Sequence, residues 1–440
     1  KEVGAAQMIP DAPAQRAGQV APAKVQVGWK PRVWIQWLHR WATLTLGGLL
    51  IVTTFSGMVA LFAFDLNRLT HPQFYRVTPA EKPVSWDAAR EAVKQAIAKD
   101  ATLKDVEARD LVARPGDSYQ FYLYTKADES AGLAFVDPGT GAYLGHYDHE
   151  KTIWGWFARL HYELFADDIK FTFPAWLPAW AKTYIGENLG EAVLKHVALL
   201  LLIMVVTGAY LWWPGIKRLL YGVTVRRNAK GYAWHYEWHK MLGFVSLPFL
   251  LMWALTGLNF YAPYSDGIKW LWYTTTLATQ PPEWPEDLQS KPTGGPMISA
   301  EQAKSIALAT VPGASLVSVT MPTVVTGTVS IWLSEGIDPY AHGEWPGQVS
   351  ITLDAYSGAV LDNSKTRDTG WAAYLYEWWF YPIHAGVAVS WPIRLIWGFF
   401  GLLPTFLGFT GVMQWWLKRQ KGKDRRARRK GLVMAPAGGD

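Results

Sequence analysis

The chain contains no cysteine among its 440 residues. Disulfides, thiolate-bound metals and cysteine-ligated iron–sulfur clusters are therefore excluded. No glycine-rich dinucleotide fingerprint follows a strand pattern and no P-loop occurs, which argues against a nicotinamide or nucleoside triphosphate site. Nor does any nucleophile–base arrangement indicate hydrolysis, so the catalytic residues are unknown. Any metal or redox chemistry must rest on histidine, carboxylates or a bound organic cofactor.

Long apolar runs dominate what is present. Half of the residues are hydrophobic and mean hydropathy is close to zero, at +0.02, so such runs must alternate with water-soluble segments. The 26 Trp residues favour a membrane interface, where an apolar ring and a polar N–H are both satisfied. Four runs are long enough to cross a hydrocarbon core about 30 Å thick as helices. They are residues 34–64, 191–213, 235–261 and 391–417.

Basic residues predict the orientation of these four spans. The connection 214–234 carries five Lys or Arg and no acidic residue, and the C-terminal tail 418–440 carries nine. Basic flanks stay in the cytoplasm, which places the N-terminal tail 1–33 there too. Segments 65–190 and 262–390 then face the periplasm of a bacterium, and the chain is a multi-pass protein of the inner membrane. The net charge of +6 reflects this topology, so we expect a lipid bilayer and no nucleic acid as a partner.

Residue patterns recur between the two halves of the chain. Eighteen residues separate His39 from Gly57, and the same number separates His239 from Gly257. Because each half crosses the membrane twice, both copies have the same orientation, related by a pseudo-two-fold axis along the membrane normal. The matched segments are 37–40 with 237–240, 207–213 with 410–416, 137–141 with 354–358, and 156–161 with 379–384.

The two outer segments have the pattern of small α+β domains. A helix is predicted from Ser85, as N-cap, to about Lys99, and a second from Ser299 to about Thr310. Apolar alternation predicts strands after each helix. These strands are 119–124 and 132–136 in the first domain, and 316–321, 329–333 and 348–353 in the second.

These motifs carry a family resemblance. A helix-and-strand unit ending Asp-Pro-Gly-Thr-Gly, flanked by Leu-His and Thr-Gly-x-x-x-Trp-Trp membrane segments, resembles the PepSY-associated transmembrane family over roughly residues 34–417. The resemblance implies a four-helix transmembrane bundle with two periplasmic PepSY-like α+β domains. Some members of that family are similar to inner-membrane iron reductases that carry two b-type haems and reduce ferric siderophores, which release iron as Fe(II).

The repeat sorts the histidines into two pairs. His39 and His239 lie at the cytoplasmic ends of the first and third spans, and His161 and His384 lie just outside the second and fourth. One histidine at a helix end is usually an interfacial residue, but a b-type haem needs two imidazoles on opposite faces of its ring. The pseudo-two-fold axis would supply one from each half. The pattern therefore predicts two bis-His haems b, one near each membrane face.

The partner of His384 remains open at this point. His196 lies within the second span and has no counterpart in the fourth, where Phe399 occupies its place. An ionisable residue at such depth is a functional candidate, so His196 competes with His161 as the outer ligand. His235, one turn from His239, is the alternative for the inner site. Gly57 shares a helix face with His39, which suits either close approach of a macrocycle or plain helix packing.

We therefore expect a two-haem electron-transfer protein. The family resemblance implies an iron reductase whose acceptor is a ferric siderophore or another periplasmic molecule. The cytoplasmic parts are too short to fold a flavin domain, so a flavoprotein, a reduced carrier or membrane quinol must supply electrons. Two alternatives belong to other classes. One is a non-redox regulatory protein whose outer domains bind a peptide, and the other is a transporter with a histidine relay.

Overall fold

The computed structural model describes residues 31–429 except 104, 115, 128 and 344–346. Most of the predicted N-terminal tail, and the last residues of the C-terminal one, thus lie outside the described residues. Within these described residues, four helices are long and apolar enough to cross a membrane, which confirms the prediction of a membrane protein with four such helices. They are α1 (Pro31–Ala60), α6 (Leu189–Trp212), the consecutive α8 (Tyr232–Val245) and α9 (Leu247–Leu258), and α13 (Trp391–Arg429).

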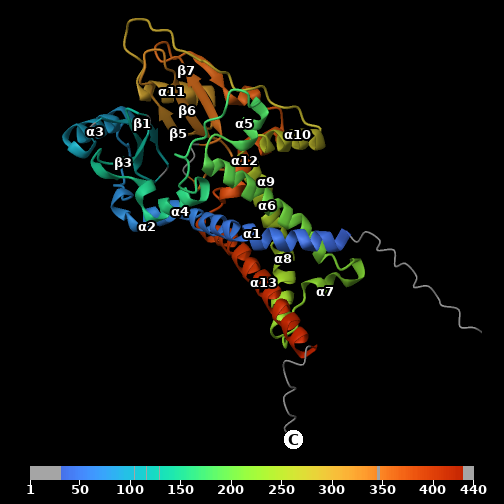
Figure 1. Cartoon of the computed structure of the whole chain (residues 1–440). Helices are drawn as coiled ribbons and strands as arrows, with labels where there is room; N and C mark the ends of the chain where they lie inside the picture. Colours follow the sequence, from blue (N-terminus) through green and yellow to red (C-terminus); the bar gives the residue numbers. More distant parts are fainter. Residues whose placement is uncertain (1–30, 104, 115, 128, 344–346, 430–440) are drawn as a thin grey trace, which may run out of the picture.

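Helix α1 crosses the other helices at a steep angle (Figure 1). It contacts α6 and α13, while α6 packs on α9 and α8 on α13. Glycines on α13 allow the close approach to α1, as small residues do in membrane packing. A methyl group on Gly408 would lie 2.6 Å from Ile51, and one on Gly401 would lie 3.1 Å from Met58. Helix α13 continues as far as Arg429 through the basic segment that follows the apolar run.

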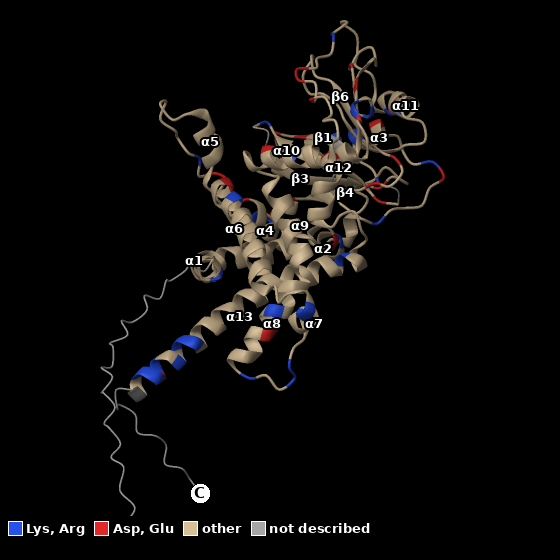
Figure 2. Cartoon of the chain, turned by 90° about the vertical axis from the view of Figure 1, so that its right-hand side faces the viewer, with Lys and Arg blue, Asp and Glu red and all other residues tan. Residues whose placement is uncertain are grey.

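Shorter helices flank the bundle (Figure 1). Helix α7 lies in the connection between α6 and α8, and the others lie toward the sheet. Figure 2 shows Lys and Arg gathered at the far end of α13 and around α7, at the end of the bundle away from the sheet. These helices are α2 (Ala63–Thr70), α4 (Ile153–Tyr162), α5 (Ala179–Ile185), α7 (Leu219–Val223), α10 (Tyr264–Thr276) and α12 (Trp371–Ala385).

The strands of both outer segments form one antiparallel sheet of eight strands, in the order β4-β3-β2-β1-β5-β6-β7-β8. The segments are joined where β1 pairs with β5, with Leu111 opposite Val319. This pairing covers one open edge from each segment, and an uncovered edge is an aggregation hazard. The strands are β1 (Val106–Val112), β2 (Tyr119–Thr125), β3 (Ser130–Val136), β4 (Tyr143–Tyr147), β5 (Ser315–Thr320), β6 (Val329–Ser334), β7 (Val349–Leu353) and β8 (Val360–Asn363).

Helices α3 (Trp86–Lys99) and α11 (Ala300–Thr310) pack on the sheet and share its main hydrophobic core. Ser85 and Ser299 cap them as the sequence predicts, each accepting a bond from a backbone N–H of the first turn. A carboxylate of each helix also accepts a hydrogen bond from the N-terminus of the other helix. Asp87 of α3 accepts from the amide of Ala300, and Glu301 of α11 accepts from the amide of Trp86. Each negative charge thus lies at the positive end of the other helix.

The matched aspartates of the two outer segments perform the same task. Asp137 follows β3 and accepts bonds from Thr78, Gly139 and Thr140, and Asp354 follows β7 and accepts from Lys291, Tyr356 and Ser357. Each carboxylate accepts hydrogen bonds from the turn that follows its strand and from a segment that precedes the helix of the same domain, at Thr78 or Lys291. Amide donors, first that of Ser357, hold the pKa of Asp354 well below its usual range.

Candidate functional site: two facing histidine pairs

The structure brings His39 and His239 together at the end of the bundle away from the sheet. His39 lies on α1 and His239 on α8, and their ring centroids are 6.4 Å apart. Nδ1 of His39 is 2.8 Å from Oγ1 of Thr207 on α6. Nδ1 of His239 is 3.0 Å from the Leu407 carbonyl and 3.0 Å from Oγ1 of Thr410 on α13. Each ring is therefore fixed by a helix other than its own.

His161 and His384 form a second pair toward the sheet; this is the outer pair, and His39 with His239 is the inner pair. His161 is on α4 and His384 on α12, with ring centroids 6.1 Å apart. Nδ1 of His161 is 2.8 Å from the Thr53 carbonyl of α1, and Nδ1 of His384 is 2.8 Å from Oγ1 of Thr256 on α9. Burial among these helices lowers the pKa of His161 and lowers that of His384 to about 3. Burial thus favours the neutral form of both imidazoles.

The hydrogen bonds assign the same tautomer to both rings of the outer pair. The Thr53 carbonyl can only accept, so Nδ1 of His161 carries the proton. The Thr256 hydroxyl already donates to the Met252 carbonyl at 2.7 Å, so its oxygen accepts from His384. In both rings Nε2 is left as a lone-pair donor, the form in which a neutral histidine binds a metal.

The inner pair follows the same logic. The Leu407 carbonyl accepts from Nδ1 of His239. Thr207 donates its hydroxyl proton to the Ile203 carbonyl at 2.5 Å, so its oxygen accepts from Nδ1 of His39. All four histidines thus present Nε2 as the free nitrogen, with Nδ1 held by a second group.

A glycine lies against each of the four rings. An added Cβ on Gly57 would lie 2.6 Å from Cε1 of His161, and on Gly208 it would lie 3.3 Å from Cε1 of His39. The corresponding distances are 3.5 Å from Gly411 to His239 and 3.7 Å from Gly257 to His384. These four glycines, each preceded by Ser or Thr, are the ones in the recurring motifs. Their role in this structure is to accept an imidazole from another helix.

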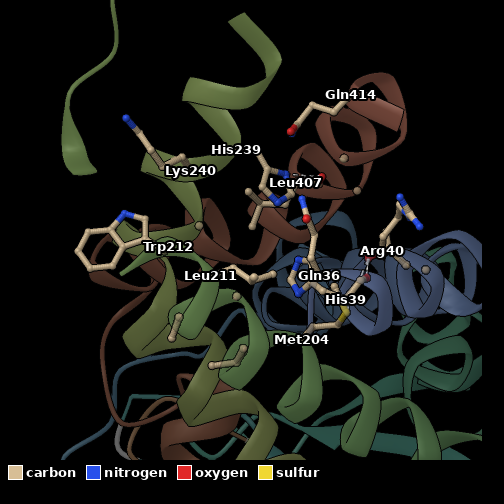
Figure 3. A pocket seen from close by; sticks show the side chains of 18 of the residues that line it. Gln36, His39, Arg40, Met204, Leu211, Trp212, His239, Lys240, Leu407 and Gln414 are labelled. Atoms are coloured by element: carbon tan, nitrogen blue, oxygen red, sulfur yellow. Dashed lines mark hydrogen bonds between the residues drawn. The ribbon is translucent and has the colours of Figure 1, made fainter. Parts of the chain in front are cut away.

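A cavity of about 770 Å³ surrounds the inner pair (Figure 3). This volume falls within the usual range of cofactor and ligand pockets, about 300–1,000 Å³. Its deep walls are apolar, and include Leu50, Met204 and Leu250. Among the described residues that line it there is no Asp or Glu, whereas Arg32, Arg40, Lys240 and Lys418 are present. The cavity therefore suits a large, flat, apolar ligand with acidic substituents near its mouth.

A protein-family match covers the segments that carry all four histidines. The family model of the PepSY-associated TM region matches residues 36–418. The chain belongs to the PepSY-associated TM family. No curated protein matches the chain.

The remaining histidines of this PepSY-associated TM protein lie apart from the two pairs. His196 is exposed on α6, with Nδ1 2.5 Å from the Ala192 carbonyl and Nε2 3.3 Å from the Tyr184 hydroxyl. His235 stacks edge-on against Phe409, and its Nδ1 is buried without a hydrogen-bond partner. In the outer domain, His146 contacts the Tyr143 hydroxyl at 3.0 Å. The geometry thus pairs His384 with His161.

Ring spacing in both pairs suits one metal between two imidazoles. Two metal–nitrogen bonds of about 2 Å, and about 1.1 Å from each nitrogen to its ring centre, sum to about 6 Å. The observed separations are 6.4 and 6.1 Å. Among the described residues, no group of three or more His, Asp or Glu could hold a metal ion. Each pair therefore suits a metal that brings its remaining ligands with it, as the iron of a porphyrin does.

Two buried cations were not predicted from the sequence. Lys195 of α6 is fully buried, and its ammonium contacts Glu191 and the carbonyls of Thr183 and Ala262. Arg394 near the start of α13 is 1% exposed. Both stand inside or beside apolar runs. A charge at such a position is expensive, and this signal marks both residues for attention.

Proposed function

We propose that this PepSY-associated TM protein is a di-haem electron-transfer protein that carries electrons across the bacterial inner membrane to a periplasmic acceptor. One observation carries the proposal. Four histidines form two facing pairs, each ring has its Nδ1 hydrogen-bonded, and each rests on a glycine. An ordinary structural histidine does not require a second imidazole across a gap of this size.

Bound haem b would supply one-electron redox chemistry, and the protein would supply ligation, burial and position. His39 and His239 would hold the inner haem, and His161 and His384 the outer one. The threonine and carbonyl partners of Nδ1 fix the orientation of each ring and increase the basicity of Nε2. The basic residues that line the inner cavity would provide counter-charges for haem propionates.

The two pairs are spaced for transfer across a bilayer. Gly57, on which His161 rests, is eighteen residues from His39 along α1, a rise of about 27 Å. Because α1 crosses the other helices steeply (Figure 1), this rise is the upper limit of the separation of the two pairs across a hydrocarbon core about 30 Å thick. Two redox centres at these levels would replace one long crossing with shorter steps.

Charge supports an orientation with the inner pair near the cytoplasmic face of the membrane. Lys and Arg gather at the end of the bundle away from the sheet (Figure 2), as expected of cytoplasmic flanks. We infer that both termini are cytoplasmic and that the sheet domain is periplasmic. The symmetrical strand order about the β1–β5 pair supports a tandem repeat in this chain.

The resemblance to di-haem reductases favours a ferric siderophore as the acceptor, which would be docked by the sheet domain and release its iron as Fe(II). A cytoplasmic flavoprotein, a reduced carrier or membrane quinol would supply the electrons, since the sequence lacks a nicotinamide fingerprint.

Colour is the decisive test. Protein produced with sufficient haem should show the reduced α and Soret bands of low-spin haem b after dithionite. Pyridine haemochrome quantification should give two haems per chain, released by acid acetone because no cysteine anchors them. A colourless preparation under those conditions would refute the function.

Single variants then assign the ligands. His39→Ala and His239→Ala should each remove the same haem and leave the other in place. His161→Ala and His384→Ala should remove the second haem and abolish reduction of an external ferric chelate. If loss at one member of a pair leaves low-spin spectra for both haems, the assignment of that pair is wrong.

A further inference from the structure

Arg394 stands at the junction of the bundle and the sheet domain, buried to 1% exposure. Its guanidinium donates five hydrogen bonds. Nε bonds the Gly386 carbonyl at 3.1 Å, and Nη1 bonds the Leu61 carbonyl at 2.9 Å and Asp65 at 2.8 Å. Nη2 bonds the carbonyls of His342 at 3.0 Å and Val389 at 3.3 Å.

Two of these acceptors, the carbonyls of Gly386 and Leu61, are linked through the backbone to the residues that hold the outer histidines. Gly386 is the C-cap of α12, two residues after His384, and its amide bonds the Pro382 carbonyl within that helix. Leu61 donates its amide to the Gly57 carbonyl at 3.0 Å, and Gly57 is the residue on which His161 rests. One guanidinium therefore holds the backbone behind both imidazoles of the pair.

A third acceptor belongs to the sheet domain. The His342 carbonyl bonds Arg394, while the His342 amide bonds the Val387 carbonyl at 3.0 Å. Gly343 packs so closely on Val387 that an added Cβ would lie 2.8 Å from it. The loop around His342 thus sits directly on the chain that follows His384.

We propose that Arg394 is the positioning residue of the outer histidine pair, and that it couples the geometry of this pair to the sheet domain above it. Asp65 supplies the counter-charge, because a guanidinium buried without a partner is strongly destabilising. Arginine is required here because its planar fork reaches several acceptors at once, which the single nitrogen of lysine cannot do. The consequence for haem rests on the proposed function, whereas the coupling of the three segments does not.

Hydrogen exchange on haem-free protein tests the coupling. Arg394→Lys and Arg394→Gln should speed amide exchange on the order of tenfold in peptides covering 57–61, 340–343 and 384–389, since buried hydrogen bonds are lost. The matched control is Arg367→Lys, which alters another largely buried arginine of the same half, paired with Asp362 in the outer domain. It should leave those three peptides unchanged.

Spectra of the haem-loaded variants test the positioning role. Arg394→Gln should lose or shift the bands of the outer haem and its midpoint potential, with the inner haem unchanged. Arg394→Lys, which keeps the charge, and Asp65→Asn should give smaller shifts of the same bands. Wild-type exchange in the three peptides, or equal damage to both haems, would overturn the proposal. If the wild-type chain binds no haem, the proposed function fails and the exchange result still decides the coupling.

Discussion

The glycines beneath the outer histidines give the sharpest prediction, because two matched positions should respond with opposite signs. In Gly57→Ala, the new Cβ would lie 2.6 Å from Cε1 and 2.7 Å from Nδ1 of His161. Carbon atoms pack at about 3.5–4.0 Å, so the ring must move by about 1 Å. That movement lengthens or breaks the 2.8 Å bond from Nδ1 to the Thr53 carbonyl.

The magnitude follows from three contributions. Overpacking costs about 1–3 kcal/mol, and a lost buried hydrogen bond costs about 1–3 kcal/mol. Alanine in place of glycine within a helix stabilises the folded state by about 1 kcal/mol. Gly57→Ala should therefore destabilise by about 1–5 kcal/mol. In Gly257→Ala the new Cβ meets His384 at 3.7 Å and Ala198 at 3.6 Å, which are ordinary contacts. Only the gain of about 1 kcal/mol remains there.

Thermal unfolding in detergent and haem content are the assays. Gly57→Ala should lower the unfolding temperature and the occupancy of the outer haem, while Gly257→Ala should match or exceed the wild type in both. Gly208→Ala and Gly411→Ala, at 3.3 and 3.5 Å from their histidines, should fall between these two. Equal changes in unfolding temperature and haem content for Gly57→Ala and Gly257→Ala would refute the inference that Gly57 leaves the space which the His161 ring occupies.

Three further outcomes are expected. Reporter fusions after Asp65 and Gly267 should read as periplasmic, and a fusion after Gly222 as cytoplasmic; a periplasmic signal from the last would reverse the topology. His196→Ala should retain both haems, because this side chain is exposed and faces Tyr184, and loss of the outer haem would contradict that. Asp354 has a folded-state pKa below its unfolded value of about 3.9. Its stabilisation is thus present above that pH and lost as the pH falls further, so Asp354→Asn should flatten acid unfolding measured by circular dichroism.

Local patterns predicted the four apolar spans and the two capped helices of the outer segments, since hydropathy, capping residues and motif spacing are properties of neighbouring residues. The shorter helices α2, α4, α5, α7, α10 and α12 were not predicted. Ser85 and Ser299 cap their helices as expected. Strand β1 was not predicted, because residues 106–112 include Glu107, Arg109 and Asp110 and show no clean alternation. Its place is decided by pairing with β2 and with β5, far away in the chain.

The histidines were found because they recur, but their surroundings were not predictable in the same way. Gly57 was interpreted through His39, which shares its helix face, whereas in the structure it contacts His161 from α4. Periodicity identifies residues on one face but does not say which helix packs against that face. Arg394 was missed for a different reason. It lies near the start of an apolar run, where it resembles a flanking charge until the carbonyls around it are known.

Each imidazole is positioned within its own half of the chain. His161 of α4 rests on α1, and His384 of α12 rests on α9; the inner rings rest in the same way on α6 and α13. The imidazoles of each pair then face one another across the boundary between the halves, with no hydrogen bond between them. Across the same boundary α1 packs on α13, α6 on α9, and β1 pairs with β5. A metal shared by each pair would therefore add a further link between the halves to these packing contacts. Cofactor binding and association of the halves should accordingly be coupled, since a ligand that binds only the assembled form stabilises it.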